Sequence, residues 1–202
     1  MKFNINSPVF QFANTFAEFV ILNVVFLITC IPVITIGAAV TALYSVVLQE
    51  AKGEGSYMLR SYWKAFGENF KKSTIIFCFY LISGAVLLFN LVFWLHMESF
   101  LGNLFLAVIS LLSLLWLISL LYVFPLQARF ENRVSCTLKN ALLIALSNRL
   151  WTAALTLIFV LALILSVYAS VFRVFLSVFG FAFLAYCCSF LLLRVFGKYE
   201  EA

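Results

Sequence analysis

The chain of 202 residues contains no aspartate, a single histidine and few charged residues of any kind. Charged side chains make up 10% of it, against about 25% in an average soluble domain. Apolar residues make up 65%, so too few polar side chains exist to cover a surface that faces water everywhere. Intrinsic disorder needs low hydrophobicity and high net charge, which this composition does not provide. A soluble globular protein and a disordered chain are therefore both excluded.

The shortage of acidic and histidine side chains also limits the possible chemistry. Carboxylate pairs, calcium loops and histidine metal sites need residues that this sequence hardly has. The motifs GxxxxGK[ST], HExxH, GxSxG and CxxC are absent as well. We therefore expect no enzyme activity, no catalytic residues, no metal and no cofactor. A chain without an ATP-binding loop cannot itself be the motor of a pump.

What the sequence has in abundance is long apolar runs, which predict an all-α fold, a polytopic transmembrane helical bundle forming a single domain over residues 1–202. The run at residues 14–48 would be about 52 Å long as one helix, too long for one crossing of about 30 Å. Pro32 and Gly37 interrupt it, and proline removes a backbone donor. Six spans are expected, at residues 12–31, 33–49, 73–95, 104–126, 150–172 and 174–194. There are five if the first helix is continuous or re-entrant.

Two polar segments, residues 50–72 and 127–149, separate the spans. In the first, Leu59, Trp63, Phe66 and Phe70 recur at helical spacing beside basic residues, which is typical of an amphipathic helix in the headgroup layer. Pro125 is expected to end the span before the second. These segments carry the candidate surface for lipid headgroups or a protein partner, formed by Arg60, Lys64, Lys71, Lys72, Arg129, Arg133 and Lys139. A basic anchor on an anionic leaflet and a docking surface for a partner are both open interpretations.

The distribution of lysine and arginine predicts the topology. With six spans, twelve of the thirteen lie on the inner side, and only Arg173, where the last two spans join, faces out. The protein is thus expected in the plasma membrane as a multi-pass protein with both termini cytoplasmic. The five-span alternative moves only Lys2 and the N-terminus outside. Because these cations lie between apolar runs, the expected partner is the lipid bilayer and not nucleic acid, despite a net charge of +5.

The pattern L-Y-x-x-x-L-Q occurs twice, at Tyr44 and at Tyr122, each time at the end of an apolar span. Asn69 and Asn148 follow these tyrosines after 25 and 26 residues, where the next span begins. The pattern suggests an internal repeat whose equivalent ends lie on the same side of the membrane. Chance is the alternative explanation, because short apolar patterns recur in so biased a sequence.

A few polar residues lie within the apolar runs. Glu18, Asn23 and Asn90 are the candidate intramembrane polar residues, because ionisable and amide groups there are often functional. For Glu18, a position in the headgroup layer is the alternative to a transport or proton-transfer role. Small residues recur at a spacing of four on one helix face, which predicts a helix-packing face first and a ligand site second: Gly37, Thr41 and Ser45.

Five stretches of the sequence carry a resemblance to a known family: residues 32–39 (PVITIGAA), 41–44 (TALY), 68–72 (ENFKK), 124–132 (FPLQARFEN) and 139–142 (KNAL). Through them the chain resembles the YesL-type bacterial membrane proteins, also described as domain of unknown function 624, over residues 5–195. The resemblance implies a plasma-membrane protein of the Gram-positive type. It also implies a genomic context of carbohydrate uptake and degradation, and it supplies no catalytic or ligand residues.

Two function classes follow from these observations. The first is an accessory or scaffold component associated with carbohydrate uptake or utilisation, with a membrane transport-system protein as a possible partner. The second is a small secondary transporter or permease subunit, suggested by the repeat, the broken helix at Pro32 and Glu18. A polar midplane cavity reached by Glu18, Asn23 or Asn90 would favour the transporter, and a dry apolar centre would count against it.

Overall fold

The computed structural model describes residues 8–55, 57–97 and 99–200, and these residues form helices and connecting turns with no strand. The all-α prediction is therefore confirmed. In chain order the elements are α1 (Pro8–Cys30), η1 (Val33–Thr35), α2 (Ile36–Ala51), α3 (Met58–Leu95), α4 (Phe100–Arg129), α5 (Val134–Ser147), α6 (Arg149–Tyr168), α7 (Ser170–Phe175), η2 (Leu176–Gly180) and α8 (Phe181–Glu200). The predicted cytoplasmic N-terminus with Lys2 lies outside the described residues.

The first apolar run is broken where the sequence predicts. The α1 helix ends at Cys30, Pro32 adopts an extended conformation, and a short 3-10 turn leads into α2. The hydroxyl of Thr35 donates to the carbonyls of Thr29 and Pro32, both at 2.6 Å. These bonds satisfy carbonyls that the end of a helix leaves without an intrahelical partner. The break therefore has its own hydrogen-bonding structure.

The third helix differs from the prediction. Residues 50–72 do not form a helix of their own: α2 runs to Ala51, a turn follows with Gly53 at φ 75°, and α3 then continues for 38 residues. At about 1.5 Å per residue it is about 57 Å long, nearly twice the thickness of a hydrocarbon core. No proline or glycine lies between Phe70 and Ser73, so each added residue extends the helix at little cost.

The second polar segment is divided differently. Pro125 does not end the fourth span, because α4 continues through it to Arg129. The missing N–H of Pro125 costs one helical hydrogen bond, which tertiary packing offsets, since residues 122–127 are all buried. A short connection leads to α5, a separate helix of 14 residues. Asn148, at φ −111° and ψ 57°, then separates α5 from α6.

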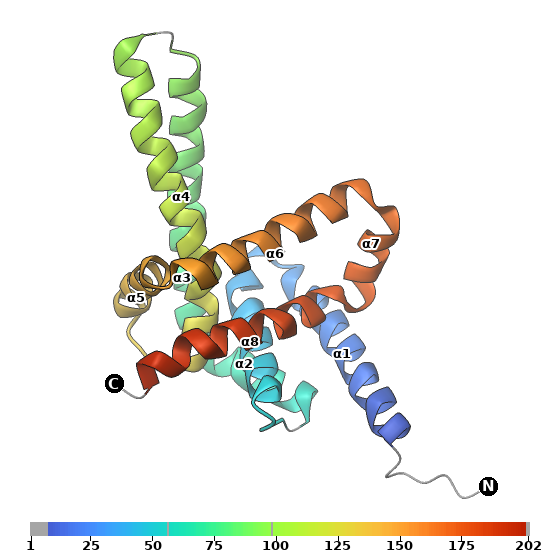
Figure 1. The fold of residues 1–202 in the computed structure, drawn as a ribbon. Helices are drawn as coiled ribbons and strands as arrows, with labels where there is room; N and C mark the ends of the chain where they lie inside the picture. Colours follow the sequence, from blue (N-terminus) through green and yellow to red (C-terminus); the bar gives the residue numbers. More distant parts are fainter. Residues whose placement is uncertain (1–7, 56, 98, 201–202) are drawn as a thin grey trace, which may run out of the picture.

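The last two predicted spans meet at a different residue from the one expected. The chain leaves α6 at Ala169, and Arg173 lies exposed within α7, where it donates to the Ser170 hydroxyl at 2.9 Å. A turn of π-helix, η2, joins α7 to α8. In Figure 1, α6 and α8 form a hairpin closed by α7, and the end of α3 and the start of α4 (green) form a second hairpin that projects away from the other helices.

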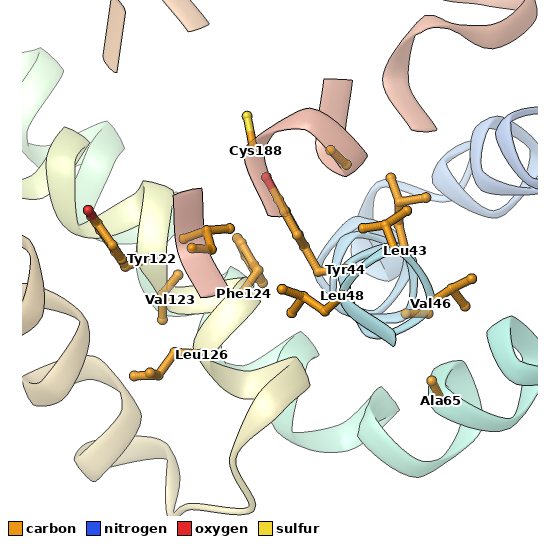
Figure 2. Packing of buried hydrophobic residues seen from close by; sticks show 14 of the residues in the cluster. Leu43, Tyr44, Val46, Leu48, Ala65, Tyr122, Val123, Phe124, Leu126 and Cys188 are labelled. Carbon is orange, nitrogen blue, oxygen red and sulfur yellow. The ribbon is translucent and has the colours of Figure 1, made fainter. Parts of the chain in front are cut away.

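The core lies where α2, α4 and α8 meet. Figure 2 shows Tyr44 and Leu48 of α2 beside Tyr122 and Phe124 of α4, with Cys188 of α8 above them. Both copies of the repeated tyrosine pattern therefore contribute to one buried cluster. Since α2 carries small side chains such as Ala38, Ala39 and Ala42, which are fully buried, its backbone can be approached closely from several sides.

Outside this core, most apolar side chains of the long helices are exposed, as expected where lipid is the solvent. Five helical stretches are long and apolar enough to cross a membrane, namely Val33–Ala51, Met58–Leu95, Phe100–Arg129, Arg149–Tyr168 and Ser170–Tyr199. Residues 14–30 of α1 form a shorter apolar helix. These helices indicate a protein embedded in a membrane.

Candidate functional site

The two basic segments are joined by a small buried network of amide and hydroxyl groups. The Nδ2 group of Asn69 in α3 donates to the Ala65 carbonyl at 3.1 Å, and its Oδ1 accepts from Nε2 of Gln127 at 3.3 Å. The Oε1 of Gln127 accepts in turn from the Thr137 hydroxyl of α5 at 3.2 Å. Gln127 and Thr137 are buried, and Asn69 is half-buried. We call Asn69, Gln127 and Thr137 the junction network.

Both segments joined by this network carry cations. The first segment supplies Arg60, Lys64, Lys71 and Lys72, all exposed, and its part within α3 carries one acid, Glu68. The second supplies Arg129, Arg133 and Lys139, beside a fourth cation, Arg149, and the acid Glu131; Arg133 and Lys139 are exposed and Arg129 is half-buried. The seven cations that the sequence singles out therefore belong to elements tied together by the junction network. We call these seven residues the basic surface.

Aromatic side chains run beside the cations of α3. Leu59, Trp63 and Phe70 are exposed, with Trp63 at 51%. The rings of Trp63, Phe66 and Phe70 contact one another in series, with centroids 5.8 and 5.6 Å apart. Gly67 lies on the same half of α3, and nothing lies within 4 Å of the place where a Cβ atom would be. The predicted pairing of an apolar stripe with basic residues is present, although on the first half of a continuous helix.

The three candidate intramembrane polar residues do not come together. Glu18 is half-buried and accepts from Nδ2 of Asn14 at 3.3 Å. Asn90 donates to the Val86 carbonyl of its own helix at 2.8 Å. Asn23 is fully buried and bonds to the backbone of η2 and α8 instead. None of the three lines the apolar hollow bounded by α1, α2, α6 and α8.

Asn23 holds the π-helical turn in place. Its Nδ2 donates to the carbonyls of Leu176 and Ser177 at 3.3 and 2.9 Å, and its Oδ1 accepts from the Ala182 amide at 3.0 Å. A π-helical turn disturbs the regular hydrogen-bond ladder of the surrounding α-helix. In a membrane each backbone group left without a partner is costly. The structure therefore places Asn23 in a structural role that ties α1 to α8.

The predicted packing face meets α3. A Cβ atom on Gly37 would lie 2.5 Å from the Ser73 carbonyl oxygen and 2.7 Å from Cβ of Phe77. The Ser73 hydroxyl donates to Oγ1 of Thr41 at 2.9 Å, and Thr41 donates to the Gly37 carbonyl at 2.9 Å. Ser45, the third member, is half-buried and lines a hollow of about 250 Å³ with Leu48, Gln49, Glu54, Ala128 and Arg129.

The two repeated segments share local hydrogen bonds. Asn69 and Asn148 each donate to the carbonyl four residues earlier, Ala65 and Ile144 respectively. Their tyrosines differ, however. The Tyr122 hydroxyl lies 2.9 Å from Oγ1 of Thr152, whereas the Tyr44 hydroxyl has no hydrogen-bond partner among the described residues. The two segments are therefore alike in the hydrogen bonds of their asparagines and differ in those of their tyrosines.

Comparison with known families identifies the first part of the chain. Residues 19–91 match the family described as "Protein of unknown function, DUF624". The resemblance to the YesL-type, DUF624 family is confirmed over these residues. They run from α1 through η1 and α2 and along most of α3, and so include the break at Pro32 and the first basic segment. Comparisons with curated proteins and with solved structures found no match.

Sequence reasoning missed the members of the junction network as a group. Gln127 was visible as the end of the repeated pattern and Asn69 as the end of a basic segment, but nothing in the sequence pairs them over 58 residues. Chemically, the arrangement offers cations, exposed aromatic rings and hydrogen-bonding amides. Among the described residues, no group of three histidine, cysteine or acidic side chains could hold a metal ion. These groups are suited to binding.

Proposed function

We propose that this chain is a non-enzymatic, multi-pass plasma-membrane protein that acts as an accessory or scaffold component, and that its basic surface docks a protein partner on the cytoplasmic side. The observation that carries the proposal is the junction network, which fixes the two cationic segments relative to each other. A fixed arrangement of seven cations on three helices can recognise one acidic surface, whereas two mobile segments could not. The excess of lysine and arginine in these segments supports their cytoplasmic location.

A role beside carbohydrate uptake or utilisation systems is the part of the proposal that comes from the family resemblance. The partner would then be a subunit of a membrane transport system. The transporter alternative gains no support from the geometry. Asn23 is occupied by backbone groups, and Asn90 bonds within its own helix. Glu18, only half-buried beside Asn14, lacks the enclosed polar surroundings of a midplane site.

The docking proposal is tested by affinity purification from native membranes with the full-length protein in mild detergent. Arg133→Glu reverses one exposed charge of the basic surface, and Arg173→Glu makes the same change on exposed α7. We expect Arg133→Glu to lower the amount of the co-purified partner several-fold at low salt, and the difference from the native protein to shrink as salt rises, because salt screens exposed charges over a length of about 8 Å. Arg173→Glu should leave it unchanged.

Two outcomes of this experiment would contradict the docking proposal. If intact membranes yield no specific partner, or if Arg133→Glu and Arg173→Glu retain it equally, the docking role is wrong. The proposed association with carbohydrate systems is tested separately, by identifying the partner that co-purifies. A partner that belongs to no uptake or degradation system for sugars would overturn that part alone.

A further inference from the structure

A second feature lies away from the basic surface, between the two arms of the α6–α8 hairpin. A hollow of about 450 Å³ opens there, with walls from α1, α2, α6 and α8. Its lining is apolar apart from two hydroxyl groups, and no charged side chain takes part; Phe26, Leu43, Phe159, Leu163, Leu176 and Phe181 are among the lining residues. We call it the Tyr44 hollow. Its volume falls within the range of about 300–1,000 Å³ that is typical of sites for small ligands.

The two hydroxyl groups in this lining differ in their bonding. The Ser166 hydroxyl donates to the Leu163 carbonyl of its own helix at 2.7 Å. The Tyr44 hydroxyl has no hydrogen-bond partner among the described residues, although Tyr44 is only 7% exposed. Figure 2 shows this hydroxyl at the end of a side chain that points away from α2 toward Cys188. Because the Tyr44 oxygen is not fully enclosed by protein atoms, the Tyr44 hollow contains one donor that opens into it and makes no hydrogen bond among the described residues.

The other buried tyrosines show that this is unusual for the fold. The hydroxyls of Tyr62, Tyr80 and Tyr122 lie 2.5, 2.8 and 2.9 Å from the hydroxyls of Thr29, Ser119 and Thr152 respectively. Polar groups that lie away from water are nearly always hydrogen-bonded in native proteins, so a hydroxyl that opens into an apolar hollow leaves room for a partner outside the protein. The hollow beside Tyr44 supplies that room, because a bound molecule could accept the missing hydrogen bond.

We propose that the Tyr44 hollow binds a neutral, lipid-like molecule, an apolar chain that carries one oxygen acceptor such as an ester carbonyl or an alcohol. The chain would occupy the apolar walls, and the oxygen would accept from the Tyr44 hydroxyl. A charged head cannot enter the hollow itself, because no charged side chain lines it. The site is independent of the docking proposal, since α3, α4 and α5, which carry the basic surface, do not line it.

Access to the hollow is from the side that lipid would cover. Leu163 on α6 is 66% exposed, and Phe181 on α8 is exposed too. Both helices belong to stretches long and apolar enough to cross a membrane. The mouth between them would therefore face acyl chains in a bilayer. Two sources share the required chemistry, namely the acyl ester of a bilayer phospholipid and a free neutral lipid.

The test uses the purified full-length protein in detergent and two photoreactive probes. One is a palmitoyl monoester of glycerol with a diazirine in its chain, and the other is a phosphatidylcholine with the same chain. After irradiation, mass spectrometry locates the labelled peptides. We expect label on the segments of α6 and α8 that line the hollow, and competition by the unlabelled compound. Labelling by the monoester identifies a free neutral lipid as the ligand, and labelling by the phospholipid alone identifies a bilayer lipid.

Two substitutions make the assignment specific. Tyr44→Phe keeps the shape and removes the donor, and we expect about threefold less label, the effect of one hydrogen bond within a membrane. Ala162→Trp, on the half-buried wall from α6, should fill the hollow and reduce the label to background. Tyr122→Phe is the matched control, because its hydroxyl is bonded to Thr152 and it does not line the hollow. Its label should equal that of the native protein.

Three results would overturn the proposal. Equal labelling of the native protein and Tyr44→Phe would mean that the hydroxyl binds nothing. Label spread as strongly over the α3–α4 hairpin as over α6 and α8 would mean general contact with lipid or detergent. Absence of label from both probes in a protein that melts at its normal temperature would mean that the hollow takes no such molecule. Comparing melting temperatures of the variants separates loss of binding from loss of fold.

Discussion

The hydrogen bonds of Asn23 lead to a quantitative prediction, which concerns Asn23→Leu. Leucine branches at Cγ as asparagine does but can neither donate to the Leu176 and Ser177 carbonyls nor accept from the Ala182 amide. Three hydrogen bonds are lost at a position that is fully buried. At about 0.6–1.7 kcal/mol for each bond within a membrane, the free energy of unfolding should fall by about 2–5 kcal/mol.

The matched control is Asn90→Leu. Its single hydrogen bond goes to the Val86 carbonyl of the same helix, so removing it should change the free energy of unfolding by less than about 1 kcal/mol. Both variants are measured by reversible unfolding of the full chain in mixed micelles, with helicity followed by circular dichroism. Equal losses for the two variants, or a smaller loss for Asn23→Leu, would refute the assignment of Asn23 as the residue that holds the π-helical turn.

Two further predictions concern the packing of two glycines and the orientation of the protein in the membrane. Gly37→Ala should lower the melting temperature by the equivalent of about 1–3 kcal/mol, because the new methyl group would overlap the Ser73 carbonyl and Phe77. Gly67→Ala, with open space around it, should raise stability by up to about 1 kcal/mol, and the opposite order in a thermal melt would contradict the packing described. Cys136 is exposed on α5 beside the basic surface, and Cys188 is fully buried. A membrane-impermeant maleimide should therefore label Cys136 in inverted vesicles but not in intact cells, and labelling in intact cells would reverse the proposed orientation.

Local sequence signals were sufficient to predict parts of the fold. Pro32 breaks the first apolar run because proline affects its own backbone wherever it lies in a helix. The spacing of Gly37 and Thr41 placed them on one helix face, and that face meets α3. Asn148 ends α5 directly before the next apolar helix. In each case the residue itself, or its neighbours on one helix, determines the outcome.

Other features depend on packing that no local pattern reveals. Pro125 resembles a helix end, but burial of its neighbours keeps α4 intact through it. Asn23 was a candidate for function because an amide in an apolar run has no visible partner, and its actual partners lie more than 150 residues away. The unpartnered hydroxyl of Tyr44 could not be predicted at all, since the repeated pattern makes Tyr44 and Tyr122 look equivalent.

The unbroken length of α3 has a mechanical consequence. One helix contains Arg60 and Lys64 near its start and the apolar hairpin with α4 at its far end. An α-helix is stiff over such a length, so a partner that tilts the charged end by about 5° would displace Leu95 by about 5 Å across a lever of about 57 Å. In the proposed orientation, a force applied on the cytoplasmic side would then reach the opposite face of the bilayer without any ligand having to cross it.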